Sequence, residues 1–299
     1  MLENFLRALH FRETIRSATP GAETDALRLV DGSGDGFDDL EVDDFAGRWL
    51  VQTRISGFPE WLKKADARSI YWKKLGDKTS PIWIAGEKIA EPFVARESGL
   101  QYWIDFSAGY SQGIFLDQRL NRAHLRRIAA DKTVLNCFAY TCAFGVSAAM
   151  GGAKTVNLDL SRNYLDWGRR NYALNGLDPA AHEFLQGDVF DWLKRLAKKG
   201  RKFDVVILDP PTFSRDDKGR IFRVENDFPE LVRSACKLLN PGGTLFSSTN
   251  QRSLWLESFR ALIEEGLPNP QQATLESSPM PPDFRGEQYL KCVWAGMSD

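Results

Sequence analysis

Acidic residues end three apolar runs in the second half of this sequence. Asp159 ends "VNLD", Asp188 ends "FLQGD" and Asp209 ends "VVILD". A carboxylate at a strand end can accept hydrogen bonds from both hydroxyls of a ribose, which suits Asp159. It can also accept from the amino group of an adenine, which suits Asp188. The pattern therefore predicts a site for a nucleoside-like ligand, built from several strand ends.

The segment Asp209-Pro210-Pro211 is the most distinctive of these strand ends. Proline has no backbone N–H and fixes φ, so two prolines hold the strand exit rigid and leave its carbonyls as acceptors. A carboxylate beside fixed carbonyls can orient a flat amino or imino edge, and the nearby Phe213 can stack on a base. A plain rigid loop is the alternative, because Pro-Pro often ends strands. The position of Asp209-Pro210-Pro211 after two other acidic strand ends favours a binding site over a plain loop.

A turn of small residues precedes these aspartates, within "VLNCFAYTCAFG" at 134–145. It joins a predicted strand to the start of a predicted helix, whose first backbone N–H groups can bind a ligand. The turn lacks the GxGxxG pattern and has too little glycine to cradle a phosphate, which disfavours a dinucleotide site. An ordinary strand-to-helix turn is the alternative.

Helix capping is the alternative for two of the aspartates. Asp159 precedes a predicted helix, but Ser161 suits the N-cap of that helix and Gly176 its C-terminal end. Asp188 directly precedes the predicted helix "VFDWLKRL", so it could be simply the N-cap of that helix.

The elements that must position these residues follow from hydrophobic periodicity. From Asp117 onward, apolar runs alternate with amphipathic helices, which predicts a mostly parallel sheet covered by helices on both faces. Before it, a short helix near the N-terminus is followed by β-type runs, and "FPEWLKKADARSIYWKKL" predicts a helix and then a strand. We therefore predict a small mixed β-rich α+β domain at 1–108 and a doubly wound α/β domain at 109–299.

Composition narrows the class of protein. The 299 residues are 43% hydrophobic with a net charge of −1, which supports a proper core and neither predicts nor excludes a polyanionic partner. Four cysteines without a CxxC pair and three scattered histidines predict no disulfide framework and no metal site. "MLENFLRALHFRETIR" has no apolar core of signal-peptide length, and no run of ~20 apolar residues occurs. We expect a cytoplasmic protein that does not enter a membrane.

These strand ends together resemble class I S-adenosylmethionine-dependent methyltransferases. The strand–turn–helix, the acidic end of strand two, the "GD" end of strand three and the "DPP" end of strand four carry the resemblance. It implies a doubly wound, mostly parallel, seven-stranded Rossmann-like sheet, with S-adenosylmethionine as cofactor and S-adenosylhomocysteine as product. The DPP form is similar to enzymes that methylate nucleobases.

A narrower resemblance is to bacterial large-subunit (23S) rRNA methyltransferases. It rests on "FLDQRLNR", "VLNCFAYT", "LDLSRNYLDWGRRNYALNGL", "LDPPTFSR" and "LFSSTNQRS", and covers nearly all of the chain from about residue 25. The helix at 161–177 and "DPPTFS" resemble the guanine-N7 enzymes of RlmK type, whereas "RLVDGSGDGFDDLEVDDFAGRWLVQTRI" resembles the middle domain of cytosine-C5 enzymes of RlmI type. The partner implied is large-subunit rRNA or a pre-ribosomal particle, and a homodimer is left open.

The resemblance also implies which residues bind and react. Arg119 would be a candidate for the cofactor carboxylate, with a surface arginine on an amphipathic helix as the alternative. The implied catalytic residues are Asp209, Pro210, Pro211 and Phe213. The implied cofactor-binding residues are Asp117, Gln118, Arg119, Asn136, Cys137, Phe138, Tyr140, Thr141, Asp159, Leu160, Ser161, Asn163, Gly187, Asp188, Val189, Phe190 and Asp209.

The sequence departs from the family pattern in three respects. The turn reads Thr141-Cys142-Ala143 where the family usually has Thr-Gly-Gly. The RNA-binding PUA domain of RlmI-type enzymes is not expected in this chain, so RNA would be held by the N-terminal domain or by a partner. Cytosine-C5 methylation needs a cysteine nucleophile, yet the positions familiar from C5 enzymes read Thr212 and "FSST". This last departure favours a nitrogen target.

Basic residues after the DPP segment are expected to contact RNA phosphates. They are Arg215, Lys218, Arg220 and Arg223. We predict an rRNA methyltransferase, guanine N7 ahead of cytosine C5. The alternatives are a methyltransferase of a protein amide or a small molecule, and a catalytically silent RNA-binding or ribosome-assembly factor.

Overall fold

Seven strands of the C-terminal half form one sheet, as the alternating pattern predicts. They are β8 (Thr133–Cys137), β9 (Lys154–Asp159), β10 (Glu183–Gln186), β11 (Phe203–Leu208), β14 (Leu239–Thr249), β15 (Ala273–Ser278) and β16 (Lys291–Met297). Their order is β10-β9-β8-β11-β14-β16-β15. The first five strands are parallel, and β16 is antiparallel to both of its neighbours. The predicted doubly wound, mostly parallel seven-stranded sheet is confirmed.

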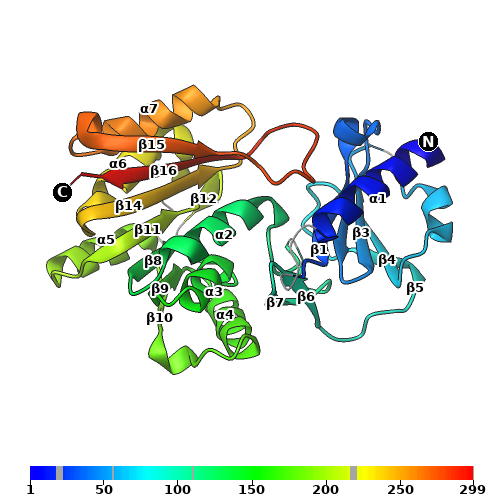
Figure 1. Ribbon diagram of the computed structural model, residues 1–299, viewed down its shortest axis with the longest axis horizontal. Helices are drawn as coiled ribbons and strands as arrows, with labels where there is room; N and C mark the ends of the chain where they lie inside the picture. Colours follow the sequence, from blue (N-terminus) through cyan, green and yellow to red (C-terminus); the bar gives the residue numbers. More distant parts are fainter. Residues whose placement is uncertain (18–22, 56, 110, 216–220, 299) are drawn as a thin grey trace. The chain divides into compact units, whose positions relative to one another are not determined.

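Helices cover both faces of this sheet (Figure 1). They are α2 (Arg119–Ile128), α3 (Ala143–Met150), α4 (Arg162–Leu174), α5 (Val189–Lys198), α6 (Val224–Cys236) and α7 (Leu256–Gly266). The short η4 (Pro179–Ala181) and η5 (Pro270–Gln272) lie in connections between elements, and η3 (Leu116–Gln118) precedes α2 in the chain. Helices α5, α6 and α7 share a hydrophobic core with the sheet, and α3 and α4 pack together and on β9. The strands β12 (Phe213–Arg215) and β13 (Ile221–Arg223) pair as a hairpin.

The sheet contains the switch point that places ligands in folds of this kind. The chain passes from β8 to β9 on one side and returns to β11 on the other side of β8. In folds of this kind, ligands bind at such a switch point, outside the carboxyl ends of the strands. Asp159 is the last residue of β9, and Asp209 directly follows β11.

The structure describes residues 1–17, 23–55, 57–109, 111–215 and 221–298. The chain divides into two compact units. Unit 1 comprises Met1–Arg119 and Met280–Gln288, and unit 2 comprises Leu120–Pro279 and Tyr289–Asp299. Unit 1 is therefore discontinuous in sequence, because a segment between β15 and β16 belongs to it.

Unit 1 is an α+β domain. It contains α1 (Leu2–Ser17), a sheet in the order β1 (Ala26–Asp31), β2 (Glu41–Phe45), β3 (Arg48–Thr53), β4 (Ser69–Lys74), β5 (Ile82–Gly86), and a hairpin of β6 (Phe93–Glu97) and β7 (Leu100–Ile104), with the short η1 (Gly32–Asp35) and η2 (Glu60–Lys64). Phe5 of α1 packs edge-on against Trp49 and Trp61. The helix predicted within "FPEWLKKADA" is wrong: only the 3-10 turn η2 forms, because Pro59 and Ala65 on either side are extended.

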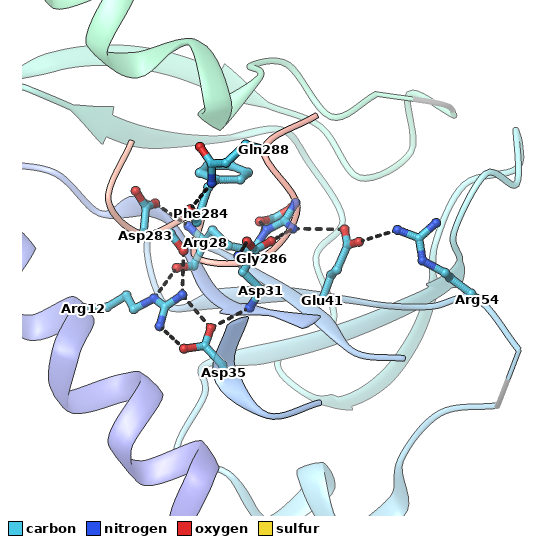
Figure 2. Close-up of polar contacts among 11 residues, drawn as sticks. Arg12, Arg28, Asp31, Asp35, Glu41, Arg54, Asp283, Phe284, Gly286 and Gln288 are labelled. Carbon is cyan, nitrogen blue, oxygen red and sulfur yellow. Dashed lines mark hydrogen bonds and ion pairs between the residues drawn. The ribbon is translucent and has the colours of Figure 1, made fainter. Parts of the chain in front are cut away.

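The segment at 280–288 is held in unit 1 by buried charges (Figure 2). The Asp283 carboxylate is fully buried and accepts from the Arg119 guanidinium and from the Arg28 backbone N–H. Its backbone carbonyl accepts from Arg12 Nη2 at 2.5 Å, and Asp31 Oδ2 accepts from the Gly286 N–H at 2.6 Å. Each buried charge thus has a counter-charge and hydrogen bonds, as stable burial requires.

Loss of Asp283 should destabilise the protein strongly. In Asp283→Ala, the Arg119 guanidinium stays buried without its counter-charge, which typically costs about 3–5 kcal/mol of unfolding free energy. Arg285→Ala is the matched control, since this half-exposed side chain pairs with Asp35 at 3.2 Å and should lose less than ~1 kcal/mol. Urea unfolding followed by circular dichroism measures both values. Equal losses in the two variants would contradict the assignment.

Candidate active site at the strand ends

The turn after β8 has an unusual backbone. Phe138, Tyr140 and Cys142 have φ of 58°, 49° and 63°, in the left-handed region that side chains other than glycine rarely adopt. Such conformations cost energy and persist where the surroundings enforce them, often at binding sites. Here Asn171 Nδ2 of α4 donates to the Thr141 carbonyl at 2.9 Å, and the Ala139 N–H donates to the Leu158 carbonyl at 3.0 Å.

Asp159 is the second element that fixes this turn. Its Oδ2 accepts from the Tyr140 N–H and its Oδ1 from the Ser161 N–H, each at 2.8 Å. Ser161 caps α4, with its Oγ accepting from the Tyr164 N–H at 3.3 Å, so the capping alternative for Asp159 is wrong. Burial raises the pKa of Asp159. Each carboxylate oxygen has more than one lone-pair direction, which leaves the geometry suited to two further hydroxyl donors.

Tyr164 was not singled out from the sequence, yet it lies beside Asp159. Its ring meets Tyr140 edge-on, with 4.6 Å between ring centroids. Burial and the nearby Asp159 charge raise the pKa of Tyr164. Of the other predicted contacts in this stretch, Leu160 and Asn163 are exposed. An exposed leucine directly after Asp159 gives this strand end an apolar side chain next to its carboxylate.

Cys142 occupies the position where the family usually has glycine, and α4 makes room for it. A Cβ added at Gly168 would lie 2.3 Å from Cys142 Sγ. The thiol therefore sits against a glycine of the neighbouring helix, which compensates for its larger volume. Cys142 is buried, and its burial raises the pKa of its thiol well above the usual range.

The side chains of Asn136 and Cys137 point into the interior of unit 2. Asn136 Nδ2 donates to Asn157 Oδ1 at 3.1 Å, and Asn157 Nδ2 donates to the Tyr172 hydroxyl at 3.0 Å. A Cβ at Gly145 of α3 would lie 2.1 Å from Asn157 Oδ1, so α3 packs closely over this polar network. Cys137 belongs to the hydrophobic core. A cofactor contact by either residue would have to use the backbone.

At the end of β10 the capping alternative is confirmed for Asp188. Its Oδ1 accepts from the Asp191 N–H at 3.0 Å and caps α5. Gly187 has φ of 141°, and a Cβ there would lie 2.8 Å from Trp192 Nε1. Val189 is a core residue. Phe190 is half-buried, and the centroid of its ring lies 6.1 Å from that of Phe222. A contact between Asp188 and an adenine stays a prediction.

The residues that follow β11 form hydrogen bonds with residues at the end of the neighbouring strand β14. Ser248 Oγ donates to Asp209 Oδ1 at 2.6 Å, and the Thr212 hydroxyl donates to Asn250 Oδ1. Pro210 is buried and Pro211 is exposed. The sequence alone predicts no site role for Ser248 or Asn250. The pairing of β11 with β14 places them beside the DPP segment.

Several predicted residues lie wholly or partly outside the described part of the chain. Lys218 and Arg220 fall in 216–220, and the side chains of Phe213 and Arg215 are not described, although both residues belong to β12. Arg223 is exposed, and its N–H donates to Asp227 Oδ2 at 2.7 Å. Stacking by Phe213 and phosphate binding by these basic residues stay predictions.

The segment at 117–119 belongs to unit 1. Asp117 and Gln118 lie in η3, and Arg119 is 5% exposed and bound by Asp283. The alternative of a surface arginine is therefore wrong. The ion pair gives Arg119 a structural task that could not be foreseen, because its partner is 164 residues away. A contact between this segment and the cofactor stays a prediction.

Comparison with known proteins decides the family. The model of the S-adenosylmethionine-dependent methyltransferase family matches residues 44–289. This chain belongs to that family. Among curated relatives, it is 38% identical over 209 residues to ribosomal RNA large subunit methyltransferase K of Neisseria meningitidis, covering 69% of this chain and 57% of that protein. It is 36% identical over 283 residues to ribosomal RNA large subunit methyltransferase I of Aeromonas salmonicida, covering 88% of this chain and 71% of that protein.

Solved structures agree with the fold of the methyltransferase. The crystal structure of SMU.776 complexed with SAH is similar over 98% of this chain and 81% of that chain, with a TM-score of 0.87 and 30% identity. The S-adenosylmethionine-dependent methyltransferase from Agrobacterium tumefaciens covers 94% of this chain and 92% of that chain, with a TM-score of 0.75 and 20% identity. The predicted cofactor class and fold are thus confirmed.

The strand ends of the methyltransferase fit S-adenosylmethionine. Asp159 offers a fixed carboxylate for ribose hydroxyls, and Gly187 keeps the end of β10 free of a side chain. Within the described ranges, no group of three or more His, Cys, Asp or Glu could hold a metal ion. In the same part of the chain, no helix is both long and apolar enough to cross a membrane.

Asp159→Asn tests the ribose assignment. The change keeps the size of the side chain but removes its charge, and a hydrogen bond to a charged group contributes about 1.5–3 kcal/mol. We expect calorimetry to show an affinity for S-adenosylhomocysteine lower by roughly 10- to 100-fold. Asp178→Asn, an exposed cap of η4 in the same unit, is the control and should bind normally. Unchanged affinity in Asp159→Asn would refute the assignment.

The same carboxylate predicts a pH dependence. Under the ribose assignment it is the ionised form that would accept from the hydroxyls, so affinity should be full above the pKa of Asp159 and should be lost as the pH falls through it. Because burial raises that pKa, the loss should begin at a higher pH than for an exposed aspartate. Asp159→Asn should lack this step in calorimetric titrations at several pH values.

Proposed function

We propose that this methyltransferase modifies a base of large-subunit rRNA, with guanine N7 favoured over cytosine C5. The observation that carries the proposal is the braced Asp209-Pro210-Pro211 end of β11, one strand away from the turn that Asp159 fixes. The names of the two curated relatives support rRNA as the substrate class. The chain spans only part of each, so the rRNA activity is a proposal for this protein.

The mechanism needs positioning more than acid–base chemistry. S-adenosylmethionine supplies a methyl group already activated on a sulfonium. The lone pair of guanine N7 forms the new N–C bond while the S–C bond breaks and its electrons return to sulfur, so no proton must be removed. The protein then contributes chiefly proximity and in-line geometry. A flipped base would be oriented by Asp209 and by the Pro210 carbonyl.

The state of the cysteines supports nitrogen over carbon as the target. Carbon methylation at C5 needs a thiolate that first adds to the ring. Burial raises the pKa of Cys137 and Cys142, and it raises the pKa of Cys236 to about 12. Cys292 is buried, and its Sγ accepts from Asn121 Nδ2 at 3.2 Å. Thr212 and Ser248, which stand near the DPP segment, carry hydroxyls that are weaker nucleophiles.

The proposal places the enzyme in the cytoplasm, where bacterial ribosomes are assembled. Its substrate is free rRNA or a pre-ribosomal particle, and self-association as a homodimer is compatible with either. Arg223, exposed on the hairpin that follows the DPP segment, is the described member of the basic set proposed to meet phosphates.

Transfer of a labelled methyl group tests the proposal. Tritiated S-adenosylmethionine is incubated with the enzyme and with rRNA from a strain that lacks this gene, both stripped and in assembled subunits. We expect label in large-subunit rRNA and a single methylated guanosine after digestion and mass spectrometry. Methylated cytidine would overturn the nitrogen target. Label only in protein or in small molecules would overturn rRNA as the substrate.

Two aspartates, Asp204 within β11 and Asp209 directly after it, separate the structural role from the chemical one. Asp209→Asn should lower kcat at least tenfold, because one hydrogen bond to a charged group contributes ~1.5–3 kcal/mol, while cofactor binding persists. Asp204, near the other end of the strand, accepts from the Thr133 N–H at 2.7 Å and from Asn240. Asp204→Asn should lower the melting temperature and leave kcat near wild type. Full turnover in Asp209→Asn would remove this residue from the mechanism.

A further inference from the structure

Among the described strands, β5 is at one edge of the sheet in unit 1 and pairs with β4 alone. It carries two apolar side chains in solvent: Ile82 is 56% exposed and Trp83 is 44% exposed. Edge strands usually avoid exposed apolar groups, because an open edge with such groups invites association. A half-exposed tryptophan at this position is therefore a candidate contact for another molecule.

Ile82 and Trp83 face opposite sides of the sheet, because they pair with Trp72 and Tyr71 respectively, and lysines lie at both ends of this edge. Lys74 ends β4, Lys78 lies in the connection to β5, and Lys88 follows β5; all three are exposed. Within the described part of the chain, none of them forms an ion pair. We call this set, Lys74, Lys78, Ile82, Trp83 and Lys88, the β4–β5 edge.

Two carboxylates, Asp77 and Glu87, lie close to the same hairpin, and each accepts a hydrogen bond. Glu87 accepts from Arg68 at 2.6 Å, and the neighbouring guanidinium lowers the pKa of Glu87. Asp77 Oδ1 accepts from the Thr79 N–H at 3.0 Å within the turn. Arg68 therefore offsets the charge of Glu87, whereas the hydrogen bond of Asp77 leaves its charge in place. The three lysines still outnumber the exposed carboxylates Asp77 and Glu91 in this stretch.

The strands β1 and β2 on the other side of this sheet show the opposite arrangement. Acidic residues of these strands form ion pairs with arginines of the same unit. Asp31 and Asp43 bind Arg28 at 2.8 and 2.6 Å. Asp35 binds the buried Arg12 at 2.6 Å (Figure 2). These ion pairs bind part of the acidic charge of β1, η1 and β2 within unit 1, whereas no ion pair of the three lysines is seen among the described residues.

We propose that the β4–β5 edge binds single-stranded RNA, with Trp83 stacking on a base and the three lysines contacting phosphates. Exposed aromatic rings flanked by lysines are the combination that sequence-tolerant single-strand binding uses. Phosphate neutralisation by lysine supplies the affinity and makes it salt-dependent. The inference rests on the proposed function, because it identifies where the RNA substrate is held outside the methyl-transfer site.

The test measures RNA binding and methyl transfer separately. Fluorescence anisotropy follows the full-length protein binding to a fluorescein-labelled single-stranded RNA of mixed sequence, at several salt concentrations. The variants are Trp83→Ala, Trp83→Phe, and a triple variant with Lys74→Gln, Lys78→Gln and Lys88→Gln. A matched triple variant at α5 and its C-cap, with Lys194→Gln, Lys198→Gln and Lys199→Gln, removes the same charge from exposed residues of unit 2.

We expect Trp83→Ala to bind RNA about tenfold more weakly and Trp83→Phe to retain most of the affinity, because any aromatic ring can stack. The triple variant of the edge should reduce the slope of log K against log salt by roughly 2, at ~0.7 per phosphate contact on a single strand. The KM for S-adenosylmethionine should not change. Circular dichroism and the melting temperature verify that each variant is folded.

Three outcomes would overturn the inference. RNA affinity equal to wild type in Trp83→Ala and in the edge triple variant would assign the edge to a protein strand or to no ligand. An equal loss in the α5 triple variant would mean that only net charge matters. Methyl transfer by the wild type with an unchanged KM for RNA in the edge variants would retain the proposed function and refute this site. Conversely, edge-dependent RNA binding without methyl transfer would refute the proposed function alone.

Discussion

Two backbone hydrogen bonds to one carboxylate organise the methyl-transfer half of this protein. Asp159 accepts from the N–H groups of Tyr140 and Ser161, and so ties the turn after β8 to the end of β9. Together with Asn171, which donates to the Thr141 carbonyl, these bonds hold a turn that has three non-glycine residues in the left-handed region. The same carboxylate is the group proposed to receive the ribose, so turn geometry and ligand recognition depend on a single side chain.

Much of the fold could be predicted because it depends on local patterns. Alternating apolar runs and amphipathic helices identified the sheet, and Ser161 marked the N-cap of α4. The strand ends could be located because parallel strands finish at the same edge. The 3-10 turn η2 was mistaken for a helix because its residues have helical propensity, whereas the extended residues on each side decide its length.

Features that depend on contacts distant in sequence could not be predicted. Asn171 reaches the Thr141 carbonyl and Ser248 reaches Asp209 only after helices and strands have packed, and a serine in "FSST" has no local signature. The ion pair of Arg119 with Asp283 joins residues 164 positions apart. The space for Cys142 beside Gly168 is equally invisible in a single sequence, because volume compensation is a property of two packed elements.

The segment at 280–288 affects the order in which the chain can fold during synthesis. Unit 1 needs this segment, yet the ribosome releases it only after almost all of unit 2 has emerged. Until then the guanidinium of Arg119 lacks Asp283, and burying it without this counter-charge would cost free energy. Residues 1–119 are therefore synthesised before the rest of unit 1. Asp283, whose carboxylate completes the ion pair with Arg119, follows only after most of unit 2.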